Sequence, residues 1–350
     1  ITKAKEYHEI DLLIELVKTF DSPKKIFESW NNLKRYSDLV QLLERTEILD
    51  ELKKLKETGQ EALYKYIEKL AFHPSSKVDM HAVMQFWREP GKFLGASAGH
   101  TPQEVHNAKK PSNYTEIPNL DLTAEQLRDA LVEGDMDGVQ VFTSMEIKYK
   151  IPIKGKEQTF IAKINKKSDP DGVLAGNDTA CCMPFGDGKN TVYTFNLNTA
   201  LFTLQIQRTD GTVRTIAQSV ITKDKDIGIQ IPEVIEKLRQ VGEHLSEVFS
   251  EDVLKKSPAY LSCDNVEVAP NYKQDEYAGI IELAYRDFFR EYMERFGHAQ
   301  EFTTDKVIIG QGYSDALTHL PVAPNTYAPL APVGYSDKTG ADVFVLNLQQ

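Results

Sequence analysis

The chain contains few cysteines, three in 350 residues. So few thiols cannot form the disulfide framework of a secreted protein, and we expect them to be reduced, as in the cytoplasm. The sequence has no apolar run of about 20 residues, the length that a helix needs to span a bilayer. Its first residues also lack the apolar core of a signal peptide. These absences predict a cytoplasmic protein without a membrane partner.

Basic residues are in deficit, with 41 Lys and Arg against 52 Asp and Glu and a formal net charge of −11. A nucleic acid is held largely by Lys and Arg contacts to its phosphates. The charge balance therefore argues against a nucleic-acid partner. Small molecules, peptides and proteins remain as partner classes.

The length predicts more than one domain, because 350 residues exceed the usual size of a single hydrophobic core. Up to about residue 110, apolar residues recur at helical intervals, as at Leu12, Leu13 and Leu16. Residues 111–137 are predicted to be a linker with a short helix. We expect the helical domain, residues 1–110, to dock a protein partner or to cover one face of a sheet.

From about residue 138 the alternation typical of strands replaces the helical period. Strand patterns occupy residues 139–142, 145–153, 159–164, 191–197, 201–207 and 213–222. Asp210-Gly211 separates the last two and is a strong hairpin signal. Further on, the patterns predict helices at 231–249 and 277–296 and strands at 260–268, 306–309 and 342–348. This order predicts an α+β protein, with an N-terminal helical domain followed by a mixed, mainly antiparallel sheet with flanking helices over residues 138–350.

Two short segments after that hairpin carry a resemblance to a known family. Val268-Ala-Pro270 ends a strand, and Gln274 to Gly279 opens the long helix. With this order of elements, residues 190–312 resemble the GNAT superfamily of acyl-CoA N-acyltransferases, in which a Gln/Arg-x-x-Gly-x-Gly/Ala loop opens the helix. The resemblance implies a GNAT-like sheet and acyl-CoA as donor, with its pyrophosphate at the helix N-terminus.

The resemblance also implies roles for individual residues in the transfer of an acyl group from a thioester to an amine. A strand carboxylate, Glu267 or Asp264, takes the amine proton, and Tyr313, just past the next strand, protonates the leaving thiolate. The implied coenzyme contacts are Val266, Val268, Lys273, Gln274 and Gly279. The structural alternatives are an exposed strand residue for Glu267 and a turn tyrosine for Tyr313.

The sequence departs from the family pattern in the loop itself. Tyr277 stands where the family has its middle glycine, and Asp275 and Glu276 add negative charge, opposed nearby by Lys273. Carboxylates close to a phosphate repel it and offset the attraction of the helix dipole. A second interpretation therefore stays open, a non-catalytic binding module on the same fold.

The segment Ala175-Gly-Asn-Asp-Thr-Ala-Cys-Cys-Met-Pro-Phe-Gly-Asp-Gly188 places two cysteines side by side. Three interpretations remain for this pair: buried packing, a reactive thiol at Cys182 in a cysteine-dependent hydrolase or transferase, and a metal site. No metal is predicted, because no second Cys or His lies at ligand spacing. The glycines predict a loop able to approach a ligand, with Gln218 and Ser219 on a neighbouring strand.

Overall fold

The computed structural model describes residues 142–165, 169–179, 181, 199–208, 211, 213–228, 251–273, 275–303, 305–311, 317, 319–329 and 342–349, together with 54 and 57–59. The predicted helical domain, residues 1–110, and the linker, residues 111–137, lie outside this part of the chain except for four residues. There, the Thr58 amide donates to the Lys54 carbonyl at 2.9 Å, which closes a helical turn. The strand predicted at 191–197 and the helix predicted at 231–249 also lie outside it.

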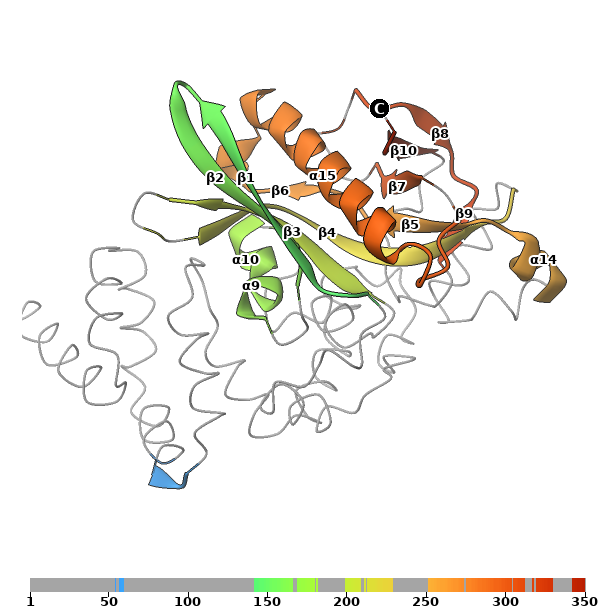
Figure 1. The fold of residues 1–350 in the computed structure, drawn as a ribbon, viewed down its shortest axis with the longest axis horizontal. Coiled ribbons are helices and arrows are strands. Elements are labelled where there is room, and N and C mark those ends of the chain that lie inside the picture. Colours follow the sequence, from blue (N-terminus) through green and yellow to red (C-terminus); the bar gives the residue numbers. More distant parts are fainter. Residues whose placement is uncertain are drawn as a thin grey trace, which may run out of the picture.

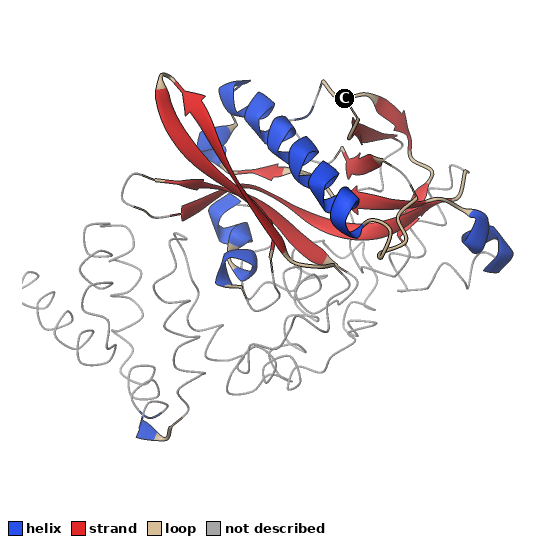
Figure 2. Ribbon diagram, in the orientation of Figure 1, coloured by secondary structure: helices blue, strands red, loops and turns tan. Residues whose placement is uncertain are grey.

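Ten strands of the described residues form one sheet (Figures 1 and 2). Eight follow one another as β1 (Met145–Ile153), β2 (Lys156–Ile164), β3 (Ala200–Gln207), β4 (Val213–Asp226), β5 (Ala259–Cys263), β7 (Lys306–Gly310), β10 (Asp342–Asn347) and β8 (Val322–Pro324). The short strands β6 (Glu267–Val268) and β9 (Tyr327–Pro329) also pair with β4. Every pairing is antiparallel except that of β5 with β7. The prediction of a mixed, mainly antiparallel sheet is confirmed.

Two tight turns set the register of two strand pairs, β1 with β2 and β3 with β4. Lys154 and Gly155 join β1 to β2 with φ of 48° and 76°, as a two-residue primed turn requires. Gly211 joins β3 to β4 with φ of 82°, and its amide donates to the Arg208 carbonyl at 2.9 Å. The second turn is the hairpin that Asp210-Gly211 predicts.

One face of the sheet is covered by the long helix α15 (Asp275–Phe296), which lies across the strands in Figure 1. Apolar side chains recur along it every three or four residues, so they form one stripe that faces the sheet. The fully buried members of this stripe are Ile281, Ala284, Tyr285, Phe288, Phe289 and Tyr292. Phe202 of β3 packs among their rings, with centroids 4.5–5.0 Å from Tyr285, Phe288 and Phe289.

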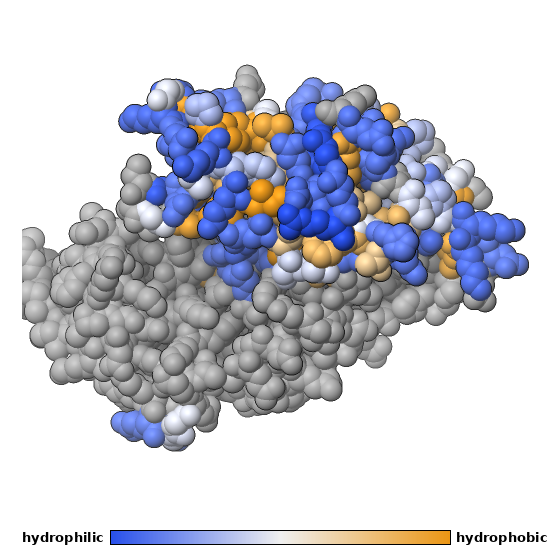
Figure 3. Space-filling model, in the orientation of Figure 1, coloured by the Kyte–Doolittle hydropathy of each residue, from blue (hydrophilic) through white to orange (hydrophobic). Residues whose placement is uncertain are grey.

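The surface around α15 is likewise divided into hydrophilic and hydrophobic parts. In Figure 3 the outward side of α15 is hydrophilic, and hydrophobic side chains appear between the helix and the β1–β2 hairpin. Ile147, Tyr149 and Ile151 of β1 are partly buried and pack against the core there. Burying a large apolar side chain contributes roughly 2–3 kcal/mol, so the contact between α15 and the sheet dominates the stability of this region.

The opposite face carries two short helices, α9 (Pro170–Val173) and α10 (Ala175–Thr179), which lie across the sheet from α15 (Figure 1). The sequence predicted a glycine-rich loop here, and for residues 175–179 that prediction is wrong. Gly176 is buried in α10, and the Thr179 hydroxyl donates to the Ala175 carbonyl, four residues back along the helix, at 3.2 Å. The remaining helices of the described part are α14 (Glu251–Lys256) and the 3-10 turn η2 (Pro270–Tyr272).

Candidate functional site

The strand predicted at 260–268 is interrupted by a β-bulge. Cys263 pairs with Ile221 of β4, and Glu267 pairs with Gln218. Two residues of β4 therefore face three residues, 264–266, on the other chain segment. An extra residue bends the strand and redirects the side chains that follow it, and such bulges are common beside active sites.

The sheet opens at this bulge. The parallel pairing of β5 with β7 ends at Cys263 and Ile309, and in the described part of the chain β6 pairs with β4 alone. After β6 the chain leaves the sheet through η2 and enters α15. A crevice at the carboxyl ends of neighbouring parallel strands is where open α/β sheets bind ligands. The side chains of Val266 and Val268 belong to the core under α15, so neither side chain can contact a ligand.

The negative charge at the start of α15 is partly neutralised by a lysine that the sequence analysis did not identify. Lys154, in the turn between β1 and β2, lies 2.9 Å from Glu276, and this contact raises the pKa of Lys154. Lys273 is exposed nearby, as is Gly279, where an added Cβ would meet no atom within 4 Å. Two lysines rather than one therefore oppose the acidic residues of the loop.

Tyr277, at the place of the family's middle glycine, is partly buried. Its ring packs edge-on against Tyr272 of η2, with 5.0 Å between the centroids. This contact occupies the space beside the first turn of α15. Gln274, the first residue of the predicted coenzyme motif, lies outside the described residues.

A row of four polar residues crosses the other face of the sheet. Lys163 of β2 pairs with Thr203 of β3, Thr203 with Gln218 of β4, and Gln218 with Glu267 of β6. Directly paired residues project from the same face, with Cβ atoms about 5 Å apart. The register therefore brings the predicted base, Glu267, beside Gln218.

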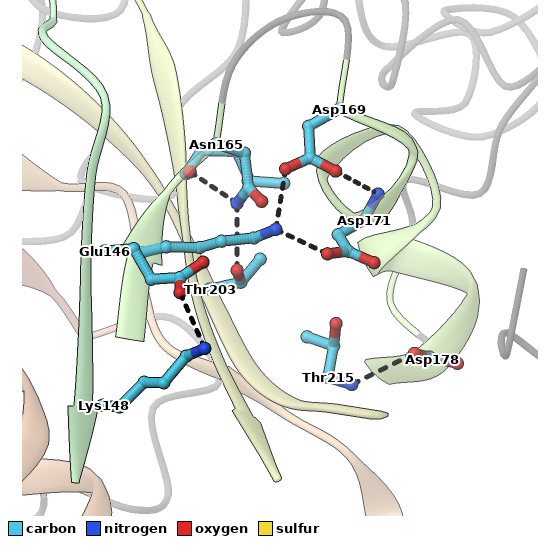
Figure 4. Close-up of polar contacts among 10 residues, drawn as sticks. Glu146, Lys148, Asn165, Asp169, Asp171, Asp178, Thr203 and Thr215 are labelled. Atoms are coloured by element: carbon cyan, nitrogen blue, oxygen red, sulfur yellow. Dashed lines mark hydrogen bonds and ion pairs between the residues drawn. The ribbon is translucent and has the colours of Figure 1, made fainter. Parts of the chain in front are cut away.

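Lys163, at one end of the row, forms ion pairs with two aspartates at the start of α9. The ammonium lies 2.7 Å from Asp169 and 2.5 Å from Asp171. Burial favours a lower pKa for Lys163, but the two carboxylates outweigh it and raise the pKa. Figure 4 shows both carboxylates directed toward the sheet, with Asn165 beside them directed at Thr203. No sequence motif marked this cluster; its only signal was a lysine at an inward strand position.

Helix α10 is fixed to β4 by its own polar contacts. Asp178 lies 3.3 Å from the Arg214 guanidinium and accepts a hydrogen bond from the Thr215 amide at 3.2 Å (Figure 4). These contacts hold Thr179 and Cys181 over the middle of the polar row.

Gln218, the third residue of the row, is completely buried. Its Nε2 donates to Thr179 Oγ1 at 2.8 Å and to Cys181 Sγ at 2.9 Å. Its Oε1 is buried and has no hydrogen-bond partner in the described part of the structure. The predicted proximity of Gln218 to the cysteine segment is thereby confirmed for Cys181.

The structure separates the other predicted residues. Ser219, expected near the cysteines, contacts Tyr285 Oη at 2.9 Å on the α15 face, where burial raises the pKa of Tyr285. Glu267 is partly exposed and accepts a hydrogen bond from Asn265 Nδ2 at 3.1 Å. Cys182 and Tyr313 lie outside the described residues.

Within the residues that the structure describes, no group of three or more His, Cys, Asp or Glu side chains could hold a metal ion. None of the helices described is long and apolar enough to cross a membrane. Comparison of the chain with protein-family models, curated proteins and solved structures gives no match.

Proposed function

We propose that this protein transfers an acyl group from a thioester to an amine at the bulge between β5 and β6. The observation that carries the proposal is the opening of the sheet beside β6, where the parallel pairing of β5 and β7 ends and α15 begins. The opening offers backbone groups and a helix N-terminus to one ligand. The partly exposed Glu267 offers a carboxylate to a second ligand from the other face.

The thioester donor occupies the opening between β6 and β7. Its anionic end lies at the first turn of α15, where Lys273 and Lys154 supply positive charge. Gly279, with open space around its Cα, allows a close approach of the donor to the helix. These features suit acyl-CoA, whose pyrophosphate is the group that a helix N-terminus binds.

Glu267 acts as general base. It accepts a proton from the amine as the nitrogen attacks the thioester carbonyl; the carbon–sulfur bond then breaks, and the thiolate takes a proton. The Asn265 amide, 3.1 Å from one carboxylate oxygen, orients Glu267. Tyr313, which follows β7 in the sequence, is the proposed acid for the thiolate.

Calorimetric titration with acetyl-CoA tests donor binding. Michaelis constants of enzymes span about 1 µM to 1 mM, so we expect heat and a thermal shift at high micromolar concentration. Lys273→Glu should weaken binding, and Lys150→Glu, an exposed lysine of β1, serves as the charge-matched control. Absence of both heat and thermal shift with the wild-type protein contradicts the proposal.

A non-catalytic binding module is the second candidate, and one observation favours it. Tyr277 packs against Tyr272 in the place where the family has a glycine. If Tyr277→Gly creates acetyl-CoA binding that the wild-type protein lacks, the tyrosine closes the coenzyme site and the module is the better description. A cysteine-dependent activity at Cys182 stays a prediction, because Cys182 lies outside the residues that the structure describes.

A further inference from the structure

We propose that two copies of this chain pair along the edge of β1 that faces away from β2, so that their sheets continue into one. β1 is the first strand in the order of the sheet, and in the described part of the structure it pairs with β2 alone. The two strands run antiparallel, and a two-fold axis relates the copies, as in most symmetric dimers. This inference is independent of the proposed function.

The first step identifies the backbone groups that this edge presents. The turn between β1 and β2 has two residues, so the pair that closes it, Ile153 with Lys156, is hydrogen-bonded. Hydrogen-bonded and non-hydrogen-bonded pairs alternate along an antiparallel ladder. The N–H and C=O groups of Glu146, Lys148 and Lys150 therefore point away from β2. A row of such groups is a template for pairing with another strand.

Pro152 supports this assignment independently. It lies two residues after Lys150, at the next position of the same series. Proline in a sheet is found on edge strands, with its nitrogen on the side that makes no ladder hydrogen bond. Because Pro152 has no N–H, it also stops the pairing short of the turn. The available edge is the part of β1 from Glu146 to Lys150.

The two faces of this edge differ in polarity. Alternate residues from Glu146 to Pro152 are exposed on one face. On the other face Ile147, Tyr149 and Ile151 are only partly buried, and Figure 3 shows hydrophobic side chains between the β1–β2 hairpin and α15. A strand added at the edge would bury more of this apolar stripe in addition to pairing the backbone groups.

Charge selects both the register and the partner. The outward backbone groups meet only in registers that differ by two residues. One of these places Glu146 opposite Lys148 of the second copy, twice because of the two-fold axis. The registers on either side place Glu146 or Lys148 opposite itself, and the next places Lys148 opposite Lys150, all of them contacts of like charge. The edge is therefore complementary to itself in one register, and the partner that it fits is a second copy.

The favoured register also makes use of contacts already present in one copy. Lys148 Nζ lies 3.4 Å from Glu146 of the same strand, so the two copies bring four charges of alternating sign together. On the apolar face Ile147 lies opposite its own counterpart, and Tyr149 lies opposite Met145. Pairs of this kind between neighbouring strands stabilise a sheet.

Sedimentation of the full chain across the micromolar range tests the inference. The wild-type protein should dimerise. Lys148→Glu turns both ion pairs into contacts of like charge and should raise the dissociation constant about 10-fold or more. Glu146→Lys should act in the same way, and the double variant, with the two charges exchanged, should restore the dimer. Lys150→Glu is the matched control, because Lys150 faces Ser144 in this register, and it should leave the dissociation constant unchanged.

Lys148→Pro tests the backbone contribution. It removes an N–H that points outward and no hydrogen bond to β2, so this variant should keep the circular dichroism spectrum of the wild-type protein and be monomeric. If it does not fold, the exchange of charges decides. A wild-type protein that stays monomeric throughout the range overturns the inference. So does a dimer that the folded Lys148 variants leave intact, because another surface then holds the copies together.

Discussion

Gln218 of β4 donates a hydrogen bond to Cys181, with 2.9 Å between Nε2 and Sγ. The two residues are 37 positions apart in the sequence, and their contact ties the end of α10 to the centre of the sheet. The same amide nitrogen also binds Thr179. The cysteine segment is thus part of a polar layer over the sheet, in which each short helix is held by side-chain contacts.

Replacing Thr179 with valine should destabilise the protein by about 1–3 kcal/mol, because the buried Gln218 amide loses an acceptor. Urea unfolding measures the change. Thr58→Val is the control, since the Thr58 hydroxyl makes the same type of bond to a carbonyl four residues back but is exposed. It should change stability by less than about 0.5 kcal/mol. Equal effects of the two substitutions would show that the buried contact contributes nothing.

Lys163→Met should cost about 2–4 kcal/mol. The lysine side chain is only 10% exposed, and its removal takes the shared ammonium away from Asp169 and Asp171, whose carboxylates then repel each other. Lys150→Met on the same hairpin breaks a pair with Glu157 whose side chains are 69% and 62% exposed, and should have little effect. Denaturation midpoints of both variants, compared at one salt concentration, provide the measurement. A Lys163 variant as stable as the wild-type protein would contradict this account of the row.

Stability should fall as the pH rises above about 10. Burial raises the pKa of Tyr285, and Asp171 and Asp169 raise that of Lys163 against the effect of burial. Their unfolded-state values are about 10 and 10.4. The unfolded chain therefore loses protons first, and the stabilisation present below pH 10 is lost progressively above it. Free energies of unfolding at pH 9 and pH 11 test this prediction. Tyr285→Phe should flatten the decline, and an unaltered slope would exclude Tyr285 as a cause.

Gly279→Ala should have opposite effects on stability and on donor binding. Alanine favours a helix over glycine by up to about 1 kcal/mol, and its Cβ meets no atom within 4 Å. The same Cβ would stand in the way of a donor lying against the first turns of α15. Thermal unfolding and acetyl-CoA titration of one variant measure both effects. Gly297→Ala is the contrasting case and should destabilise the protein, because its Cβ would lie 2.5 Å from the Met293 carbonyl.

The sequence was sufficient for the parts of the fold that depend on local patterns. The alternation in 145–153 and the apolar stripe of 277–296 predicted β1 and α15 within two residues, because one buried face imposes a regular period. Asp210-Gly211 predicted the β3–β4 hairpin because a tight turn needs a residue with positive φ, and Gly211 adopts one.

Long-range pairing determines what the sequence could not indicate. The bulge at 264–266 depends on the register between β4 and two separate strands, which alternation alone cannot show. The partner of Glu276 is Lys154, more than a hundred residues earlier. Gln218 was expected near the cysteines only on the assumption that neighbouring strands pair in order. Its hydrogen bonds to Thr179 and Cys181 depend on where α10 packs on the sheet, which the sequence does not indicate.

Release of free thiol from acetyl-CoA in the presence of n-butylamine tests the central claim most directly. The wild-type protein should release thiol only when both substrates are present. Glu267→Gln keeps the oxygen that accepts the Asn265 hydrogen bond but cannot act as base, so it should lower the rate about 100-fold or more. Glu157→Gln, an exposed glutamate of β2, should react like the wild-type protein. Thiol release that does not depend on the amine, or that is equal in the wild-type and Glu267→Gln proteins, would contradict the account.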